Sequence, residues 1–128
     1  MSTATLTTSV EKIQPTAIIK LDGPLNDFHA KELIGIIDDL LPQNFVHFII
    51  NFDKCIEVNN YGVSVLISLI SSINAKQGKL IFTKVDAHLE KKLKMMGLAA
   101  YAEFYSEDKV ALDCLLYTSP SPRDVSTS

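Results

Sequence analysis

Residues 45–52 (FVHFIINF) form the segment that most constrains the fold. The segment is almost continuously apolar, whereas a strand with one solvated face has a polar residue at every second position. Such a run is typical of a strand buried on both faces, at the centre of a sheet that helices cover. The sequence therefore predicts a sheet built around this strand.

Signals for further strands and helices alternate on both sides of this segment. Strands are indicated by period-two alternation or by β-branched residues bounded by turn residues. Helices are indicated by apolar residues at helical spacing, between a capping residue and a Gly or Pro. The predicted strands are residues 5–10, 17–21, 45–52, 79–83 and 101–105, and the predicted helices run from Asn26 or Asp27 to Pro42, from the turn at 59–62 to Gln77, from Asp86 to Gly97, and from Ser106 through Leu112.

The order of these elements is ββαβαβαβα, in which a hairpin precedes strands joined by helices. Strands joined by helices of this length pair mainly in parallel, with right-handed crossovers. We therefore expect an α/β fold, with a mixed, mainly parallel sheet and helices packed on it. The length of 128 residues, with 47% apolar and 21% charged residues, suits one domain.

The C-terminal residues do not fit this pattern. Residues 118–128 (TSPSPRDVSTS) are rich in Ser, Thr and Pro and have no apolar periodicity, which predicts disorder. Residues 114–124 (CLLYTSPSPRD) also look like the translation of a transposase-type sequencing adapter. We therefore place the domain at residues 1–113 and interpret residues 114–128 as a disordered, non-native tail.

Composition and charge exclude several functions. The net charge of -3 and the pI of about 5.5 argue against binding to nucleic acid or to an anionic membrane, which requires clustered Lys and Arg. No apolar run is long enough for a membrane span, and the N-terminus has no basic patch followed by an apolar block, so we expect no signal peptide. The two cysteines, Cys55 and Cys114, are too few for a disulfide framework, which favours a cytoplasmic setting.

Catalytic and metal-binding motifs are not evident in the sequence, so we expect no enzyme activity and no cofactor. There is no phosphate-binding loop, and no pair of His or Cys residues has ligand spacing. His47 is expected to be a core histidine, and Cys55 a buried thiol without an activating partner. The remaining candidates are expected to lie on the surface: His29, His88, Lys91, Lys92 and Lys94.

The turn at residues 59–62 (NNYG) stands directly before the most apolar predicted helix. Asn59 and Asn60 both suit the N-cap of that helix, which is a purely structural explanation. Tyr61 would present an amphipathic ring at the helix start, which suits contact with a protein partner. Gly62 would allow close approach of either a neighbouring backbone or a partner. Capping and docking are therefore both open.

Several separated motifs resemble those of a STAS domain of the anti-sigma factor antagonist type. The match covers roughly residues 16–112 and depends on the order and spacing of the motifs. They are IIKLDGPLN at 18–26, FIINFDKCIEVNNYGVSVL at 48–66, AKQGKLIFTKV at 75–85 and LEKKLKMMGLAAYAEFY at 89–105. The resemblance implies a small protein-binding module that sequesters an anti-sigma factor, and so permits sigma-dependent transcription.

The resemblance also implies a phosphorylation site that this chain has altered. In the family, the serine before the helix-start Gly is phosphorylated by a kinase that is also the anti-sigma factor. Here that position holds Tyr61, the preceding Asp and Ser correspond to Asn59 and Asn60, and the Asp of the earlier turn corresponds to Asn26. We expect Tyr61 not to be phosphorylated, which leaves Ser64 as the nearest substitute hydroxyl.

The predicted docking surface combines both turns, and its residues are Asn59, Asn60, Tyr61, Gly62, Gly23 and Asn26. Its expected partner is an anti-sigma factor or a related serine kinase. One alternative is a STAS subunit of another assembly, such as a stress-signalling complex or lipid-transport machinery. A second is a nucleotide-binding or enzymatic α/β domain, although the turn has one Gly and no Lys for a phosphate.

Overall fold

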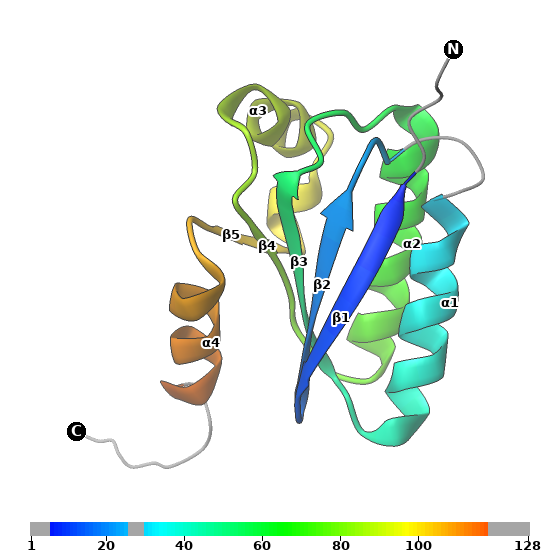
Figure 1. The fold of residues 1–128 in the computed structure, drawn as a ribbon, viewed down its shortest axis with the longest axis vertical. Helices are drawn as coiled ribbons and strands as arrows, with labels where there is room; N and C mark the ends of the chain where they lie inside the picture. The colour runs from blue at the N-terminus through cyan, green and yellow to red at the C-terminus, as the bar shows by residue number, and fades with distance from the viewer. Residues whose placement is uncertain (1–5, 26–29, 118–128) are drawn as a thin grey trace.

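The computed structural model describes residues 6–25 and 30–117. Five strands form one sheet in the order β1-β2-β3-β4-β5 (Figure 1). β1 and β2 are antiparallel, and every other neighbouring pair is parallel. The strands are β1 (Thr7–Ile13), β2 (Thr16–Asp22), β3 (His47–Lys54), β4 (Leu80–Thr83) and β5 (Glu103–Tyr105). The predicted α/β class, element order and mainly parallel sheet are confirmed.

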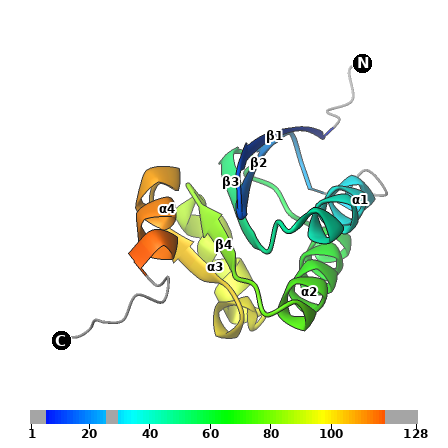
Figure 2. The same cartoon turned by 90° about the horizontal axis from the view of Figure 1, so that it is seen from below.

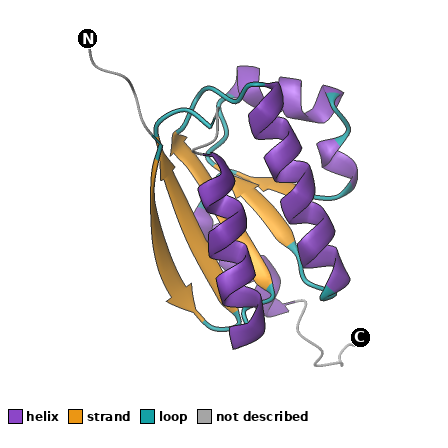
Figure 3. Cartoon of the chain, turned by 90° about the vertical axis from the view of Figure 1, so that its right-hand side faces the viewer, coloured by secondary structure: helices purple, strands orange, loops and turns teal. Residues whose placement is uncertain are grey.

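Helices cover both faces of the sheet, as Figures 2 and 3 show. α1 and α2 lie side by side on one face, and α4 lies on the other face over β3, β4 and β5. Short 3₁₀ helices follow α1 and α3. The helices are α1 (Lys31–Leu40), η2 (Leu41–Gln43), α2 (Asn60–Ala75), α3 (Ala87–Met95), η3 (Leu98–Ala100) and α4 (Asp108–Tyr117).

The core strand has the predicted burial. Phe48, Ile50 and Phe52 belong to the larger core, which also contains buried side chains of α1, α2 and α3. Ile49 points to the opposite face and packs in a smaller cluster with residues of α4. Because side chains alternate along a strand, the near-continuous apolar run serves both faces of the sheet.

The C-terminal boundary differs from the prediction. We placed the start of the disordered tail at residue 114, but α4 continues to Tyr117. Leu115 is buried, and with Ala111 it packs against the second face of the sheet. This apolar contact explains why the helix passes the predicted boundary at that point. Residues 118–128, and Asn26 and Asp27 as caps of α1, lie outside the described residues, and the non-native origin of the tail stays a prediction.

His47 has the structural role that the sequence predicted, although it is half-buried and not fully enclosed. Its Nδ1 accepts a hydrogen bond of 3.1 Å from the backbone N–H of Lys79, which joins β3 to the start of β4. Burial first, and the positive charge of Lys79 second, lower the pKa of this imidazole. A protonated Nδ1 could not accept that bond.

The lowered pKa predicts a pH dependence of stability. A lowered folded pKa gives a stabilisation that is present above the unfolded value of about 6.5 and is lost as the pH falls through the folded pKa. We expect the urea midpoint to fall between pH 7 and pH 5. His47→Asn retains an acceptor without titrating there, so part of that fall should disappear in the variant. An identical pH dependence in both proteins would contradict this assignment.

Candidate docking surface

Two turns lie together at the carboxyl end of the sheet because the pairing of β2 and β3 continues beyond both strands. The Gly23 N–H donates to the carbonyl of Lys54 at 2.9 Å, and the Leu25 N–H donates to the carbonyl of Glu57 at 2.8 Å. Leu25 also forms a parallel bridge with Val58. The turn after β2 and the loop after β3 are therefore held as one backbone unit.

The cap of α2 is Asn59, which decides between the two predicted capping residues. Asn59 has an extended backbone, and its side-chain oxygen accepts a hydrogen bond of 2.8 Å from the Gly62 N–H. Asn60 is already the first helical residue, and its side chain is exposed. Capping thus accounts for Asn59 and leaves the amide of Asn60 at the surface.

Gly62 supports the helix start from beneath and does not form its outer surface. It is buried, and a Cβ built on it would lie 2.1 Å from the carbonyl oxygen of Leu25 and 2.9 Å from a methyl carbon of Val58. The backbone of the preceding turn thus occupies the place of a side chain. Glycine is required here by a close approach within the protein itself.

Tyr61 lies at the surface of the first turn of α2, with 36% of its area exposed. It lines a shallow groove of about 390 Å³ between α1 and α2, together with Lys31, Ile34, Ser64, Val65 and Ser68. The hydroxyl of Ser64 donates a hydrogen bond of 3.2 Å to the carbonyl of Asn60. Apolar and hydroxyl groups therefore surround the ring, with Lys31 at one side.

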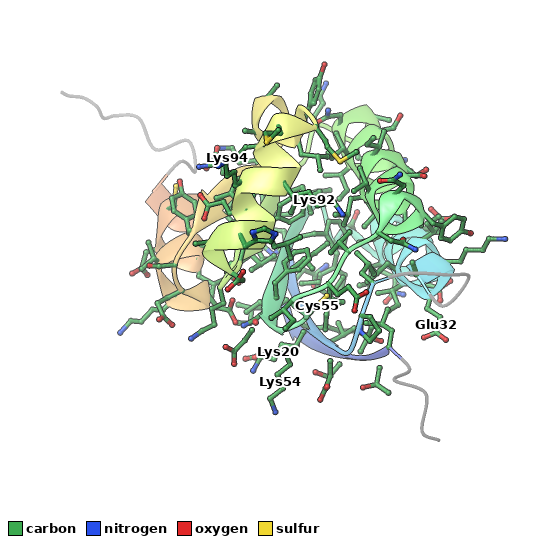
Figure 4. The ribbon with its side chains drawn as sticks, turned by 90° about the horizontal axis from the view of Figure 1, so that it is seen from above. Lys20, Glu32, Lys54, Cys55, Lys92 and Lys94 are labelled. Atoms are coloured by element: carbon green, nitrogen blue, oxygen red, sulfur yellow. The ribbon has the colours of Figure 1, made fainter. Side chains whose placement is uncertain are left out.

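Two contributors to this region were not found from the sequence. Ile56 lies in the loop after β3 and is 73% exposed. Lys92 reaches from α3 toward α2, as Figure 4 shows, and its Nζ donates a hydrogen bond of 2.5 Å to the Val58 carbonyl. An isolated apolar residue in a loop and one lysine in a lysine run carry no signal of such placement. We call the exposed residues Ile56, Asn59, Asn60 and Tyr61 the docking platform.

The remaining predicted site residues have plain structural positions. Gly23 is half-buried, and Asn26 lies outside the described residues. Burial raises the pKa of the Cys55 thiol to about 11, and the thiol lies 3.7 Å from the carbonyl of Glu57. Cys55 is therefore a neutral thiol and a poor nucleophile at physiological pH. His88 and Lys91 are exposed, while Lys94 forms an ion pair with Glu90.

Metal sites and membrane-spanning helices are absent from residues 6–25 and 30–117. No group of His, Cys, Asp and Glu in these ranges could hold a metal ion. Within the same ranges, no helix combines the length and apolar character needed to cross a membrane.

Residues 7–111 match the model of the STAS domain family. The chain belongs to this family. Solved structures of other proteins have folds similar to that of this chain. The phosphorylated form of the Bacillus cell fate determinant SpoIIAA aligns over 85% of this chain and 99% of its own, with 19% identity and a TM-score of 0.69. An anti-sigma factor antagonist from Mycobacterium paratuberculosis aligns over 88% and 95%, with 14% identity and a TM-score of 0.73.

A solved structure of a different kind of protein has a similar fold. A sulfate transporter family protein from Wolinella succinogenes aligns over 84% of this chain and 91% of its own, with 21% identity and a TM-score of 0.71. No curated protein matches the chain in sequence. The predicted family is confirmed, and identities this low establish the fold and not the role of this particular chain.

The packing of Gly62 predicts a large effect from one methyl group. Gly62→Ala should destabilise the protein by about 1–3 kcal/mol, because the new Cβ overlaps a backbone carbonyl that cannot move freely. Gly35→Ala is the matched control, since nothing lies within 4 Å of a Cβ at that helical position. The control should stabilise the protein by about 0.5–1 kcal/mol. Urea unfolding measures both, and equal effects would refute the packing argument.

Proposed function

We propose that this STAS domain is a non-catalytic, protein-binding module that binds an anti-sigma factor through the docking platform. The observation that carries the proposal is the exposure of Tyr61 and Ile56 beside the polar Asn59 and Asn60, on a backbone fixed from beneath by Leu25 and Gly62. Amphipathic aromatic and aliphatic side chains on a rigid element are suited to anchor a protein interface.

The start of α2 carries no negative charge of its own. Its first turn has no acidic residue, so no side chain there neutralises the positive end of the helix dipole. A phosphate on the platform would add nearly two negative charges to a surface that packs against a partner. Because the family's serine position holds Tyr61 here, we propose that the platform stays in its binding-competent state.

The neighbouring hydroxyl of Ser64 is a weak replacement for the missing serine. Its O–H group donates to the backbone carbonyl one turn earlier, so the hydroxyl lies along the helix side and not at the helix end. The hydroxyl of Tyr61 stands at the end of a rigid ring, several ångströms beyond the place of a serine oxygen. An active site shaped for serine should therefore transfer phosphate to neither residue.

A second candidate function is a STAS subunit of another assembly, such as a stress-signalling complex or transport machinery. The replacement of the phosphoacceptor favours it, since a permanent subunit has no need for that switch. The similar fold of the sulfate transporter family protein is compatible with it. The first function requires binding to an anti-sigma factor, whereas the second does not, so a binding measurement separates them. A nucleotide site at the turn is disfavoured because Gly62 is buried and the turn has no lysine.

The platform predicts a selective loss of partner binding. Tyr61→Ala should weaken binding to the purified anti-sigma factor of the source genome by about tenfold or more, as expected for an aromatic anchor. Tyr101→Ala is the matched control, because Tyr101 is also an exposed tyrosine but lies in the segment after α3. Calorimetry gives both affinities. If no anti-sigma factor of that genome binds, or if both variants bind like the wild type, the proposal fails.

The altered phosphoacceptor predicts the outcome of a kinase assay. The unmodified chain, incubated with the partner kinase and ATP, should carry no stoichiometric phosphate by mass spectrometry. Tyr61→Ser places a hydroxyl where the family has its acceptor, so this variant should gain one phosphate and then lose affinity for the kinase. Adding Ser64→Ala to that variant should leave the phosphate in place. A stoichiometric phosphate on Tyr61 of the unmodified chain would contradict the prediction.

A further inference from the structure

The two border strands of the sheet differ in length. β1 and β5 stand at the ends of the strand order β1-β2-β3-β4-β5 (Figure 1). β5 has three residues, whereas β1 has seven. A border strand presents a row of backbone N–H and C=O groups to which another strand can bond, and proteins commonly limit this by keeping such strands short. β5 is short in this way, and β1 is not.

β1 is a regular strand with an open outer edge. Its register with β2 runs from Thr7 to Ile13 without a bulge, and its sequence (TTSVEKI) contains no proline. Within residues 6–25 and 30–117, β2 is its only strand neighbour. Six of its seven residues are exposed, among them Val10 at 37% and Ile13 at 43%. The outer edge of β1 is therefore able to accept another strand.

The lysine of β1 lies against the protein's own core. Lysines on border strands often oppose the addition of another strand. Here the Nζ of Lys12 lies 5.9 Å from the centroid of the Phe45 ring, and Phe45 belongs to the larger core. Its ammonium group is thus held over one face of the sheet. Thr8 and Val10 share that face, because side chains alternate along a strand.

We infer that the outer edge of β1 pairs with β1 of a second copy of this chain in antiparallel orientation. The five strands of each copy would then join into one continuous sheet. A two-fold axis perpendicular to the sheet relates the copies, so facing residues lie on the same face of the sheet. One residue must then face its own copy at the axis. The identity of this central residue fixes the whole register.

Val10 is the central residue that the sequence of β1 favours. It is the middle residue of the strand, so only this centre pairs all seven residues. A centre at Glu11 would oppose two carboxylates, and a centre at Lys12 would oppose two ammonium groups, which is destabilising. With the centre at Val10, the facing pairs across the two copies are Val10 with Val10, Ser9 with Glu11, Thr8 with Lys12, and Thr7 with Ile13.

The polar pairs of this register are chemically compatible. The hydroxyl of Ser9 can donate to the carboxylate of Glu11, and the hydroxyl of Thr8 can accept from the ammonium group of Lys12. Each of these pairs occurs twice because of the two-fold symmetry. No charge faces its own sign. Since a single pair of strands is a small contact, the dimer should be weak and depend on concentration.

The test compares charges placed at the axis. Sedimentation velocity of the full chain, from about 10 µM to about 1 mM, should show a shift from monomer to dimer. Val10→Lys and Val10→Glu should each abolish the dimer in this range, because either charge would face its own copy. An equimolar mixture of the two variants should recover it, because opposite charges then meet at the axis. Val10→Thr, which is neutral and β-branched, should retain it.

Matched controls separate this contact from other effects. Val110 is also an exposed valine, at 45%, but lies on α4. Val110→Lys, Val110→Glu and their mixture should all dimerise like the wild type. Circular dichroism melts should show every variant folded, since both valines lie at the surface. Tyr61→Ala should leave the dimer unchanged. The inference uses no residue of the docking platform, so it and the proposed function can fail separately.

Four results would overturn the inference. The first is a wild type that stays monomeric up to about 1 mM. The second is a wild-type dimer that both charged Val10 variants retain, and the third is a mixture of those variants that stays monomeric. The fourth is a dimer that Tyr101→Ala abolishes. That result would place the second copy in the groove of about 340 Å³ that Ile67 and Tyr101 line, between α2 and the segment after α3.

Discussion

The backbone of Leu25 is the joint on which the start of α2 depends. Its N–H donates to Glu57, its carbonyl accepts a bond of 3.4 Å from the Asn59 N–H, and the same carbonyl fills the space beside the Cα of Gly62. Residues from two separate turns thus meet at the backbone of one residue. Because peptide geometry is stiff, this contact sets where α2 begins relative to the sheet. The position of Tyr61 follows from that start.

The contacts of the Leu25 backbone explain how turn residues can form a rigid surface. Turns and loops are usually the mobile parts of a domain, and a platform on a mobile turn would lose conformational entropy when it bound a partner. Here the turn backbone is bonded to its neighbours, and Lys92 adds a bond from α3 to the Val58 carbonyl. The exposed side chains are therefore held in place before a partner arrives, which lowers the cost of association.

The features that could be predicted from the sequence are those set by local pattern. The apolar run around β3 predicted a central buried strand, and Asp86 was correctly identified as the cap of α3. The requirement for Gly at position 62 could be suspected, but its cause, the Leu25 carbonyl, is a contact between residues 37 positions apart in the sequence. Periodicity reports which side of an element is apolar and does not report what touches it. The choice of Asn59 over Asn60 depended on the same tertiary geometry.

The parts that the sequence did not predict share a physical cause. Ile56, Lys92 and the groove that Ile67 and Tyr101 line become visible only when elements distant in sequence are packed together. The same packing makes α2 unusual, because a helix with seven buried residues and no charge still borders a groove on each side. Its buried face fixes it against the core, so its remaining surface is presented without distortion. The exposed surface of α2 is therefore uncharged between the two grooves that border it.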